Sequence, residues 1–191
     1  AIMGAGNIAH QFCDAVTLVE DCEVSAIASK DLGRAQKFAE ECSVAHAYDN
    51  YEQMLIEEKP DCVYIAVTPN DHFRLTMLCL EHRVPVLCEK AMFTNSAEAK
   101  AVFEKAEKDQ TFVMEAMWSR FLPAVNQAKK WAAEGKIGRL EALQGRIGFL
   151  APEGADNRYH SPLLCGGAAT DITVYAYEIA TWLVNEPVRK T

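Results

Sequence analysis

Short apolar runs alternate with helix-forming stretches from the first residue as far as Glu115. The apolar runs predict strands, and the spacing of apolar residues between them predicts helices. The strands are expected over residues 1–3, 23–28, 62–67, 84–88 and 111–115, and the helices over 7–19, 32–42, 50–58, 72–82 and 96–108. The run at 62–67 is apolar throughout, which is typical of a strand covered on both faces. Residues 47–48 are expected to begin a short connection. This alternation predicts an α/β fold with a parallel sheet and helices on both faces.

The pattern changes after Ala116. A helix is predicted over 123–134, residues 140–149 alternate and predict a strand that opens a second sheet, and a loop over 151–162 precedes a single helix over 168–184. One strand and two helices cannot bury a sheet face by themselves. We therefore place a domain boundary at Ala116 and expect residues 117–191 to be the incomplete, N-terminal part of an α+β substrate and dimerisation domain. The true start of the chain is expected to lie before Ala1.

Composition excludes several classes of function. The 191 residues suffice for one full domain and part of another. No apolar stretch reaches the roughly 18 residues of a transmembrane helix, and no signal peptide is evident, so we expect no membrane partner. The formal net charge of −8, without a basic face, argues against a nucleic-acid partner.

The cysteines and histidines do not predict a metal site. The chain has seven cysteines and five histidines, with no C-x-x-C pair and no ligand spacing. Several cysteines lie in apolar runs such as residues 61–65. We interpret them as reduced, mostly buried side chains of a cytoplasmic protein.

Residues 4–9, G-A-G-N-I-A, fit the pattern G-x-G-x-x-G/A between a predicted strand and a predicted helix. In that pattern Gly4 permits the tight turn, Gly6 lets a pyrophosphate approach the backbone, and Ala9 allows close packing of helix on strand. The helix N-terminus at Asn7 and Ile8 then faces the phosphates. Because the motif also begins a βαβ unit, it predicts a dinucleotide-binding Rossmann domain over residues 1–116.

The end of the second predicted strand bears on which dinucleotide binds. NAD enzymes usually carry an acidic residue there for the ribose hydroxyls, whereas this chain has Ser29 and Lys30, with Arg34 in the next helix. A hydroxyl and two cations suit a 2′-phosphate, so NADP is favoured over NAD. Two alternatives stay open. In the first alternative, Lys30 and Arg34 are simply solvated residues at the start of a helix. In the second, Asp31 turns toward a ribose, which favours NAD.

Four further segments resemble a known family. Residues 68–72 (T-P-N-D-H) and 88–90 (C-E-K) follow successive strand ends in the order of the glucose-fructose oxidoreductase/inositol dehydrogenase/MocA (Gfo/Idh/MocA) family. Within that family, residues 114–121 (M-E-A-M-W-S-R-F) resemble the branch of the dimeric dihydrodiol dehydrogenases. Residues 166–175 (G-G-A-A-T-D-I-T-V-Y) are similar to the G-G-x-x-x-D-x-x-x-Y of its dimeric dihydrodiol dehydrogenase and NADP-linked D-xylose dehydrogenase branch. The resemblance covers essentially the whole chain.

The resemblance implies an NAD(P)-dependent oxidoreductase that transfers a hydride between a nicotinamide and a sugar, polyol or cyclic diol hydroxyl. The resemblance further implies that Lys90 would lie beside the nicotinamide and the substrate hydroxyl, and that Tyr175 would be the general acid/base. Asp171, four residues before Tyr175, orients it or binds substrate, with both side chains on one face of a single helix. The remaining cofactor-binding residues implied are Thr68, Pro69, Asn70, His72 and Glu89 in the cleft at the strand ends, with Trp118 and Arg120 on its nicotinamide side. By analogy with the family, the partners are a small-molecule substrate and a second copy of the chain, in a homodimer or higher homo-oligomer.

One position departs from the family pattern. The motif E-K-P reads E-K-A at residues 89–91, and Ala91 strongly favours a trans peptide bond where proline permits a cis bond. The position of Lys90 is less constrained as a result.

Each candidate also has a simpler interpretation. In the simpler interpretation, Lys90 is a solvated loop residue and Trp118 packs between domains. Asp171 and Tyr175 then form a surface pair or belong to the core. The ordered set of motifs favours the enzyme. Two further hypotheses remain: a catalytically silent relative that binds the dinucleotide as a sensor or scaffold, and a structural Rossmann-like domain without a nucleotide.

Overall fold

The structure, a computed structural model, describes residues 1–154 and 157–184. Contacts divide the chain into two compact units, Ala1–Ala116 and Met117–Thr191, and each is described by itself. The expected loop at 151–162 includes residues 155–156, which lie outside the described residues, as does the end of the second unit at 185–191.

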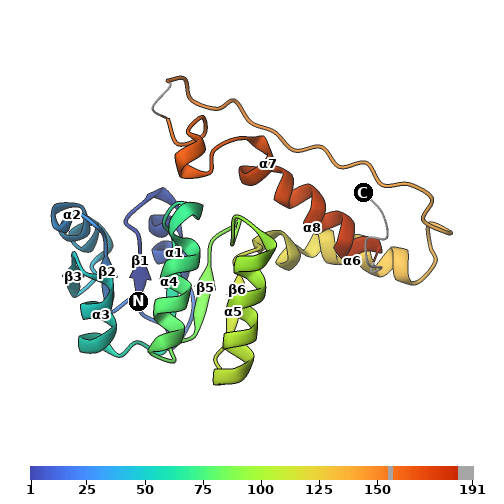
Figure 1. Cartoon of the computed structure of the whole chain (residues 1–191). Coiled ribbons are helices and arrows are strands. Elements are labelled where there is room, and N and C mark those ends of the chain that lie inside the picture. Colours follow the sequence, from blue (N-terminus) through green and yellow to red (C-terminus); the bar gives the residue numbers. More distant parts are fainter. Residues whose placement is uncertain (155–156, 185–191) are drawn as a thin grey trace. The chain divides into compact units, whose positions relative to one another are not determined.

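The first unit is built on a parallel six-stranded sheet (Figure 1). Its strands are β1 (Ile2–Met3), β2 (Ala26–Ala28), β3 (His46–Tyr48), β4 (Val63–Ile65), β5 (Val86–Cys88) and β6 (Val113–Glu115). Their order is β3-β2-β1-β4-β5-β6, and every neighbouring pair is parallel. The chain therefore starts in the middle of the sheet, builds one half and returns to build the other. The predicted α/β class with a doubly wound Rossmann sheet is confirmed.

Helices cover both faces of this sheet. They are α1 (Asn7–Val16), α2 (Leu32–Cys42), α3 (Tyr51–Glu58), α4 (Pro69–Glu81) and α5 (Ser96–Asp109). Alternate residues of the strands point to opposite faces. Ile2 and Ile27 pack with α1 and α2, and their neighbours Met3 and Ala28 pack in the core cluster of α3 and α4. Helix α5 joins α4 through Leu80, Val102 and Ala106.

Several elements of the first unit differ from the sequence-based expectation. Helix α1 ends at Val16 and β2 begins at Ala26, inside the expected ranges 7–19 and 23–28. Residues 46–48 form β3, which pairs with β2, where a connection was expected. Its side chains are half-buried or exposed at the sheet edge, so it lacks the apolar run that marks the other strands. Helix α4 begins at Pro69, before the expected 72, because proline is tolerated in a helix's first turn, where no intrahelical N–H partner is needed.

The second unit contains short helices among its described residues. These are the 3₁₀ turns η1 (Trp118–Phe121) and η2 (Pro162–Leu164), and the α-helices α6 (Pro123–Ala133), α7 (Ala168–Asp171) and α8 (Thr173–Val184). The expected strand over 140–149 is wrong: these residues belong to no strand and no helix. A strand needs a hydrogen-bonded neighbour, and the described part of this unit offers none.

The expected single helix over 168–184 is also wrong. It breaks at Ile172, whose backbone (φ −121°, ψ −38°) lies outside helical geometry. Three consecutive β-branched residues, 172–174, favour the break because they lose side-chain freedom in a helix. Asp171 therefore ends α7 while Tyr175 lies in α8, and the argument that places both on one face of one helix does not hold.

Candidate functional site

The glycine loop lies where the sheet order reverses. Gly4 has φ +109°, and a Cβ there would lie 2.7 Å from the carbonyl carbon and oxygen of Ala66, at the end of β4. Only glycine fits this close approach. At Gly6, by contrast, the nearest atom to a Cβ is the Ala66 oxygen, 4.0 Å away. The protein itself therefore does not require glycine at position 6, and the open space above the loop suits a ligand group close to the backbone.

Helix α1 presents its N-terminus at this loop. Gly6 is the N-cap, no side chain caps the helix, and no acidic residue lies in its first turn. Asn7 and Ile8 are exposed, while Ala9 is completely buried against the sheet. Uncapped N–H groups at a helix N-terminus bind anions such as a pyrophosphate. The loop thus fits a dinucleotide.

The connection after β2 carries the residues expected to distinguish NADP from NAD. Ser29 is buried, and its hydroxyl lies 3.5 Å from the Asp31 nitrogen. The Asp31 carboxylate accepts a hydrogen bond from the Arg34 N–H at 2.7 Å and so caps α2. Arg34 donates through its guanidinium to the Ala5 carbonyl at 3.1 Å, which brings its charge to the glycine loop. Lys30 forms an ion pair with Asp71 of α4.

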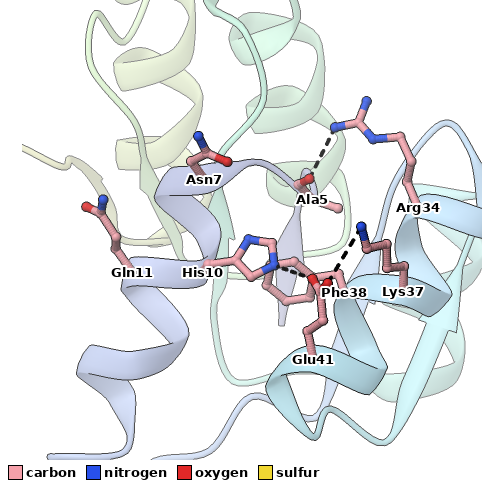
Figure 2. Close-up of a pocket in the computed structure, with 8 residues that line it drawn as sticks. All are labelled: Ala5, Asn7, His10, Gln11, Arg34, Lys37, Phe38 and Glu41. Carbon is pink, nitrogen blue, oxygen red and sulfur yellow. Dashed lines mark hydrogen bonds and ion pairs between the residues drawn. The ribbon is translucent and has the colours of Figure 1, made fainter.

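An open pocket of about 580 Å³ adjoins the glycine loop between α1 and α2 (Figure 2). Arg34 and Lys37 supply two cationic side chains to its lining. Lys37 lies 3.7 Å from Glu41, and His10 contacts the same carboxylate at 3.0 Å. The remaining lining residues are Ala5, Asn7, Gln11 and Phe38.

The segment after β4 begins α4. Thr68 is the N-cap, Pro69 opens the helix and Asn70 is exposed in its first turn. These residues lie at the carboxyl edge of the sheet, where open α/β sheets bind ligands.

His72 does not line a cleft, contrary to expectation. Its side chain is completely buried, with Nε2 3.0 Å from the Val67 oxygen and Nδ1 3.0 Å from the Ala91 oxygen. Burial lowers the pKa of His72 below its ordinary value, although these carbonyls act in the opposite direction. The ring therefore ties the segment after β4 to the segment after β5.

Lys90 follows β5 in a segment fixed by two carboxylates. Glu89 accepts a hydrogen bond from the Tyr64 hydroxyl at 2.6 Å and one from the Lys90 N–H at 3.1 Å. Glu115 accepts one from the Met92 N–H at 2.9 Å. Glu89 therefore shapes the backbone that carries Lys90. The peptide bond between Lys90 and Ala91 is cis, so the expectation of a trans bond at Ala91 is wrong.

In the second unit, Trp118 and Tyr175 are brought together. The Trp118 indole N–H donates to the Tyr175 hydroxyl oxygen at 3.0 Å, and the two rings meet edge to face. Tyr175 is buried and Trp118 is exposed. Because the indole occupies one lone pair of the hydroxyl oxygen, it restricts where the hydroxyl hydrogen can point.

Glu178, one turn after Tyr175, organises η1. Its buried carboxylate accepts from the Ser119 hydroxyl at 2.8 Å and from the Arg120 Nε at 2.6 Å. The Arg120 guanidinium also stacks 4.7 Å from the Trp182 ring centre. Asp171 contacts a guanidinium nitrogen of Arg158 at 3.5 Å. Arg120, expected to approach a nicotinamide, forms an ion pair with Glu178, and its role toward a cofactor stays a prediction.

The comparisons with known proteins agree with this geometry. A sequence model of the Gfo/Idh/MocA family, described as an oxidoreductase family with an NAD-binding Rossmann fold, matches residues 1–117. A model of the family's C-terminal domain matches residues 125–191. The chain belongs to the Gfo/Idh/MocA family. The family recognised from the motifs is confirmed.

Individual relatives of this Gfo/Idh/MocA protein are dehydrogenases. The chain is 32% identical to trans-1,2-dihydrobenzene-1,2-diol dehydrogenase from Mus musculus, over 95% of this chain and 55% of that enzyme. It is 30% identical to D-xylose 1-dehydrogenase (NADP⁺) 2 from Haloferax volcanii, over 98% of this chain and 58% of that enzyme. A probable dehydrogenase from Thermotoga maritima shares the fold, with a TM-score of 0.82, 21% identity, and coverage of 98% of this chain and 55% of that one. The chain spans a little over half the length of these relatives.

Several residues of this family member escaped sequence reasoning. Lys37 lies one turn after Arg34 and was readable only as a solvated helix residue, and Glu178 was hidden in an apolar helix. Tyr64 and Glu115 lie in strands, and only the sheet register brings their polar atoms to the Lys90 segment. An acidic residue within an otherwise apolar helix, as at Glu178, was the one signal in the sequence that could have identified it.

The structure was also searched for metal and membrane features. Within residues 1–154 and 157–184, no cluster of three or more histidine, cysteine or acidic side chains has the arrangement of a metal site. None of the helices in those same ranges has the length and apolar character needed to cross a bilayer.

Proposed function

We propose that the protein to which this chain belongs is an NADP-dependent oxidoreductase. Its substrate is a small molecule with an oxidisable hydroxyl: a sugar, a polyol or a cyclic diol. The observation that carries the proposal is the glycine loop. Gly4 is required by the fold itself, whereas Gly6 leaves open space beside an uncapped helix N-terminus. Membership of an oxidoreductase family and the activities named for its relatives support the type of reaction.

The bound cofactor would be held through its pyrophosphate by the glycine loop and the first turn of α1. Arg34 already extends from α2 to the loop backbone, so a cation lies beside the phosphate site. Thr68, Pro69, Asn70 and the Glu89–Lys90 segment lie at the carboxyl edge of the same sheet and would line the rest of the cleft. NADP is proposed over NAD because Asp31, the acidic residue after β2, caps α2 with its carboxylate.

The chemistry proposed for the protein's own residues is acid–base catalysis. The nicotinamide, when bound, supplies or accepts the hydride. As the substrate carbon loses its hydride and the C–O double bond forms, the phenolate form of Tyr175 takes the hydroxyl proton, and in the reverse direction the Tyr175 hydroxyl returns that proton. Lys90 stabilises the developing negative charge on the substrate oxygen with its ammonium group. Trp118 orients the Tyr175 hydroxyl through its indole N–H.

A matched pair of variants tests this assignment. Tyr175→Phe removes only the hydroxyl, so turnover of aldoses or cyclic diols with NADP should fall by at least about a hundredfold. Binding of NADPH should stay within about twofold of wild type. Tyr177→Phe, an exposed tyrosine of the same helix, is the control and should leave both unchanged.

Cofactor binding is measured by energy transfer from tryptophan to reduced nicotinamide, and turnover by its absorbance. A Tyr175→Phe variant that keeps full turnover rejects the role of Tyr175. A wild-type protein that binds NADPH but oxidises none of these substrates favours the silent sensor or scaffold, and one that binds neither NADPH nor NADH favours a structural domain. Assembly into a homodimer or higher homo-oligomer and a cytoplasmic location stay predictions.

A further inference from the structure

Two lysines flank Arg34 near the glycine loop, and their surroundings differ. Lys30 precedes α2 and forms its ion pair with Asp71, whose side chain is only 16% exposed. The same carboxylate lies 3.4 Å from the Arg74 Nε. Burial alone raises the pKa of Asp71, but the hydrogen bond and the charge of Lys30, together with those of Arg74, outweigh burial and hold the pKa below its ordinary value. Asp71 is therefore ionised at neutral pH and retains Lys30.

Lys37 forms a weaker ion pair with Glu41 than Lys30 forms with Asp71. It lies 3.7 Å from Glu41, and both side chains are well exposed, at 75% and 47%. Exposed pairs one helical turn apart contribute little and are screened by salt. Glu41 is also contacted by His10, which lowers the pKa of Glu41 below its ordinary value. The Lys37 ammonium can therefore leave Glu41 at little cost.

Arg34 and Lys37 both line the open pocket beside the glycine loop, where Figure 2 shows them on neighbouring turns of α2. Arg34 contacts a neutral carbonyl, that of Ala5, and not a carboxylate. A phosphate monoester carries close to two negative charges near neutral pH and is bound best by cations that are not already neutralised. A phosphate brought to Lys30 also meets the Asp71 carboxylate.

We infer that this chain recognises the 2′-phosphate of NADP with Arg34 and Lys37 in this pocket, while Asp71 keeps Lys30 out of the site. The inference rests on the proposed function and adds to it a specificity-determining residue, Lys37, and a residue that restrains a competing cation, Asp71. Lys30, expected from its position to bind the phosphate, becomes a structural partner of α4.

Charge-neutral variants of the two lysines separate the alternatives. In the intact protein, Lys37→Gln should weaken NADPH binding about five- to tenfold and leave NADH binding within about twofold, as expected for one lost charge-assisted contact. Lys30→Gln should change NADPH binding less than about twofold. Lys100→Gln is the matched control, because Lys100 is equally exposed and lies 3.7 Å from Glu104 in α5.

Asp71→Asn tests the restraint on Lys30. Releasing Lys30 should strengthen NADPH binding about two- to fivefold, and adding Lys30→Gln to this variant should remove that gain. Competition by 2′-AMP and 5′-AMP against NADPH locates the effect, because Lys37→Gln should weaken only 2′-AMP.

Three results overturn the inference: a larger effect of Lys30→Gln than of Lys37→Gln, an equal loss of NADPH and NADH in Lys37→Gln, or a wild-type preference for NADH. A wild-type protein that binds neither cofactor rejects the proposed function itself. Selective loss of NADPH in Lys37→Gln supports the inference whichever substrate the enzyme proves to use.

Discussion

The completely buried side chains of the first unit are almost all apolar, whereas the small buried group of the second unit is half polar. In the first unit, both faces of the sheet are packed by aliphatic, aromatic and cysteine side chains from the strands and helices. Among the described residues of the second unit, the buried side chains are Met117, Ser119, Tyr175 and Glu178. Helix α6 contributes none.

This difference has a physical consequence for how each unit responds to change. Burial of apolar area is non-directional and spread over many residues. A hydrogen-bonded cluster depends on every partner, because a buried polar group left without one costs free energy. The first unit should therefore be destabilised most by substitutions that create cavities. The second unit should be destabilised most by substitutions that remove a single polar partner.

The largest effect is expected from a cavity in the first unit. Ile65 of β4 is completely buried in the middle of the sheet. Ile65→Ala should lower the free energy of unfolding by about 2–5 kcal/mol through lost burial and an incompletely filled cavity. Urea unfolding of the intact protein, followed by far-UV circular dichroism, measures the change.

Ile56→Ala is the matched control, since Ile56 is 54% exposed. It should change the free energy of unfolding by less than about 0.5 kcal/mol. Equal effects of the two substitutions would contradict a stability based on apolar burial in this unit.

A smaller effect is expected from the polar cluster of the second unit. Glu178→Ala removes the acceptor of both Ser119 and Arg120 and should cost about 1–3 kcal/mol, because the Ser119 hydroxyl stays buried while Arg120 reaches solvent. Faster hydrogen exchange in α8 and a changed near-UV signal of Trp182 should accompany the loss.

Glu141→Ala provides the comparison for this cluster. Its carboxylate pairs with Arg139 on the surface, where both side chains are mostly exposed. It should change the stability by less than about 0.5 kcal/mol. If Glu178→Ala is as mild as this control, the cluster does not hold the second unit together.

The smallest effect is expected from a carboxylate at the edge of the sheet. Burial raises the pKa of Glu58, but the hydrogen bond from Tyr48 and the contact with His46 outweigh it and hold the pKa below its ordinary value. A group whose pKa is lower in the folded state stabilises the protein fully above its unfolded value, near 4.5. That contribution is lost as the pH falls through the folded value.

Glu58→Gln should therefore lower the free energy of unfolding at pH 7 by less than about 1 kcal/mol, and the difference from wild type should shrink as the pH falls below about 4.5. Glu57→Gln, an exposed neighbour, is the control. A difference that stays constant down to pH 3 would contradict the assigned role of Glu58.

Many features of the first unit could be predicted from local pattern. The apolar strands, the helix over 32–42 and the glycine loop all follow from residues close together in the chain, so their signals survive without tertiary information. Strand β3 was missed because an exposed edge strand has no distinctive apolar pattern. The break at Ile172 was missed because helical spacing outweighed the three β-branched residues in the pattern.

The candidate site was predictable only as a set of residue types. The motifs identified the family and nominated Lys90, Trp118 and Tyr175, and the structure pairs Trp118 with Tyr175. The role of His72 could not be read from the sequence, because burial by three segments decides it. The same holds for Lys30, whose partner Asp71 is remote in the chain.

The sequence by itself determined the class of fold, the order of strands and helices in the first unit apart from β3, the glycine loop and the family. These properties depend on periodicity and on residues that are neighbours in the chain. Only the tertiary structure decided which charged side chains are neutralised, which remain available at the pocket and which polar side chains are buried. Electrostatic contacts and burial depend on distances between segments far apart in sequence, and no local pattern encodes those distances.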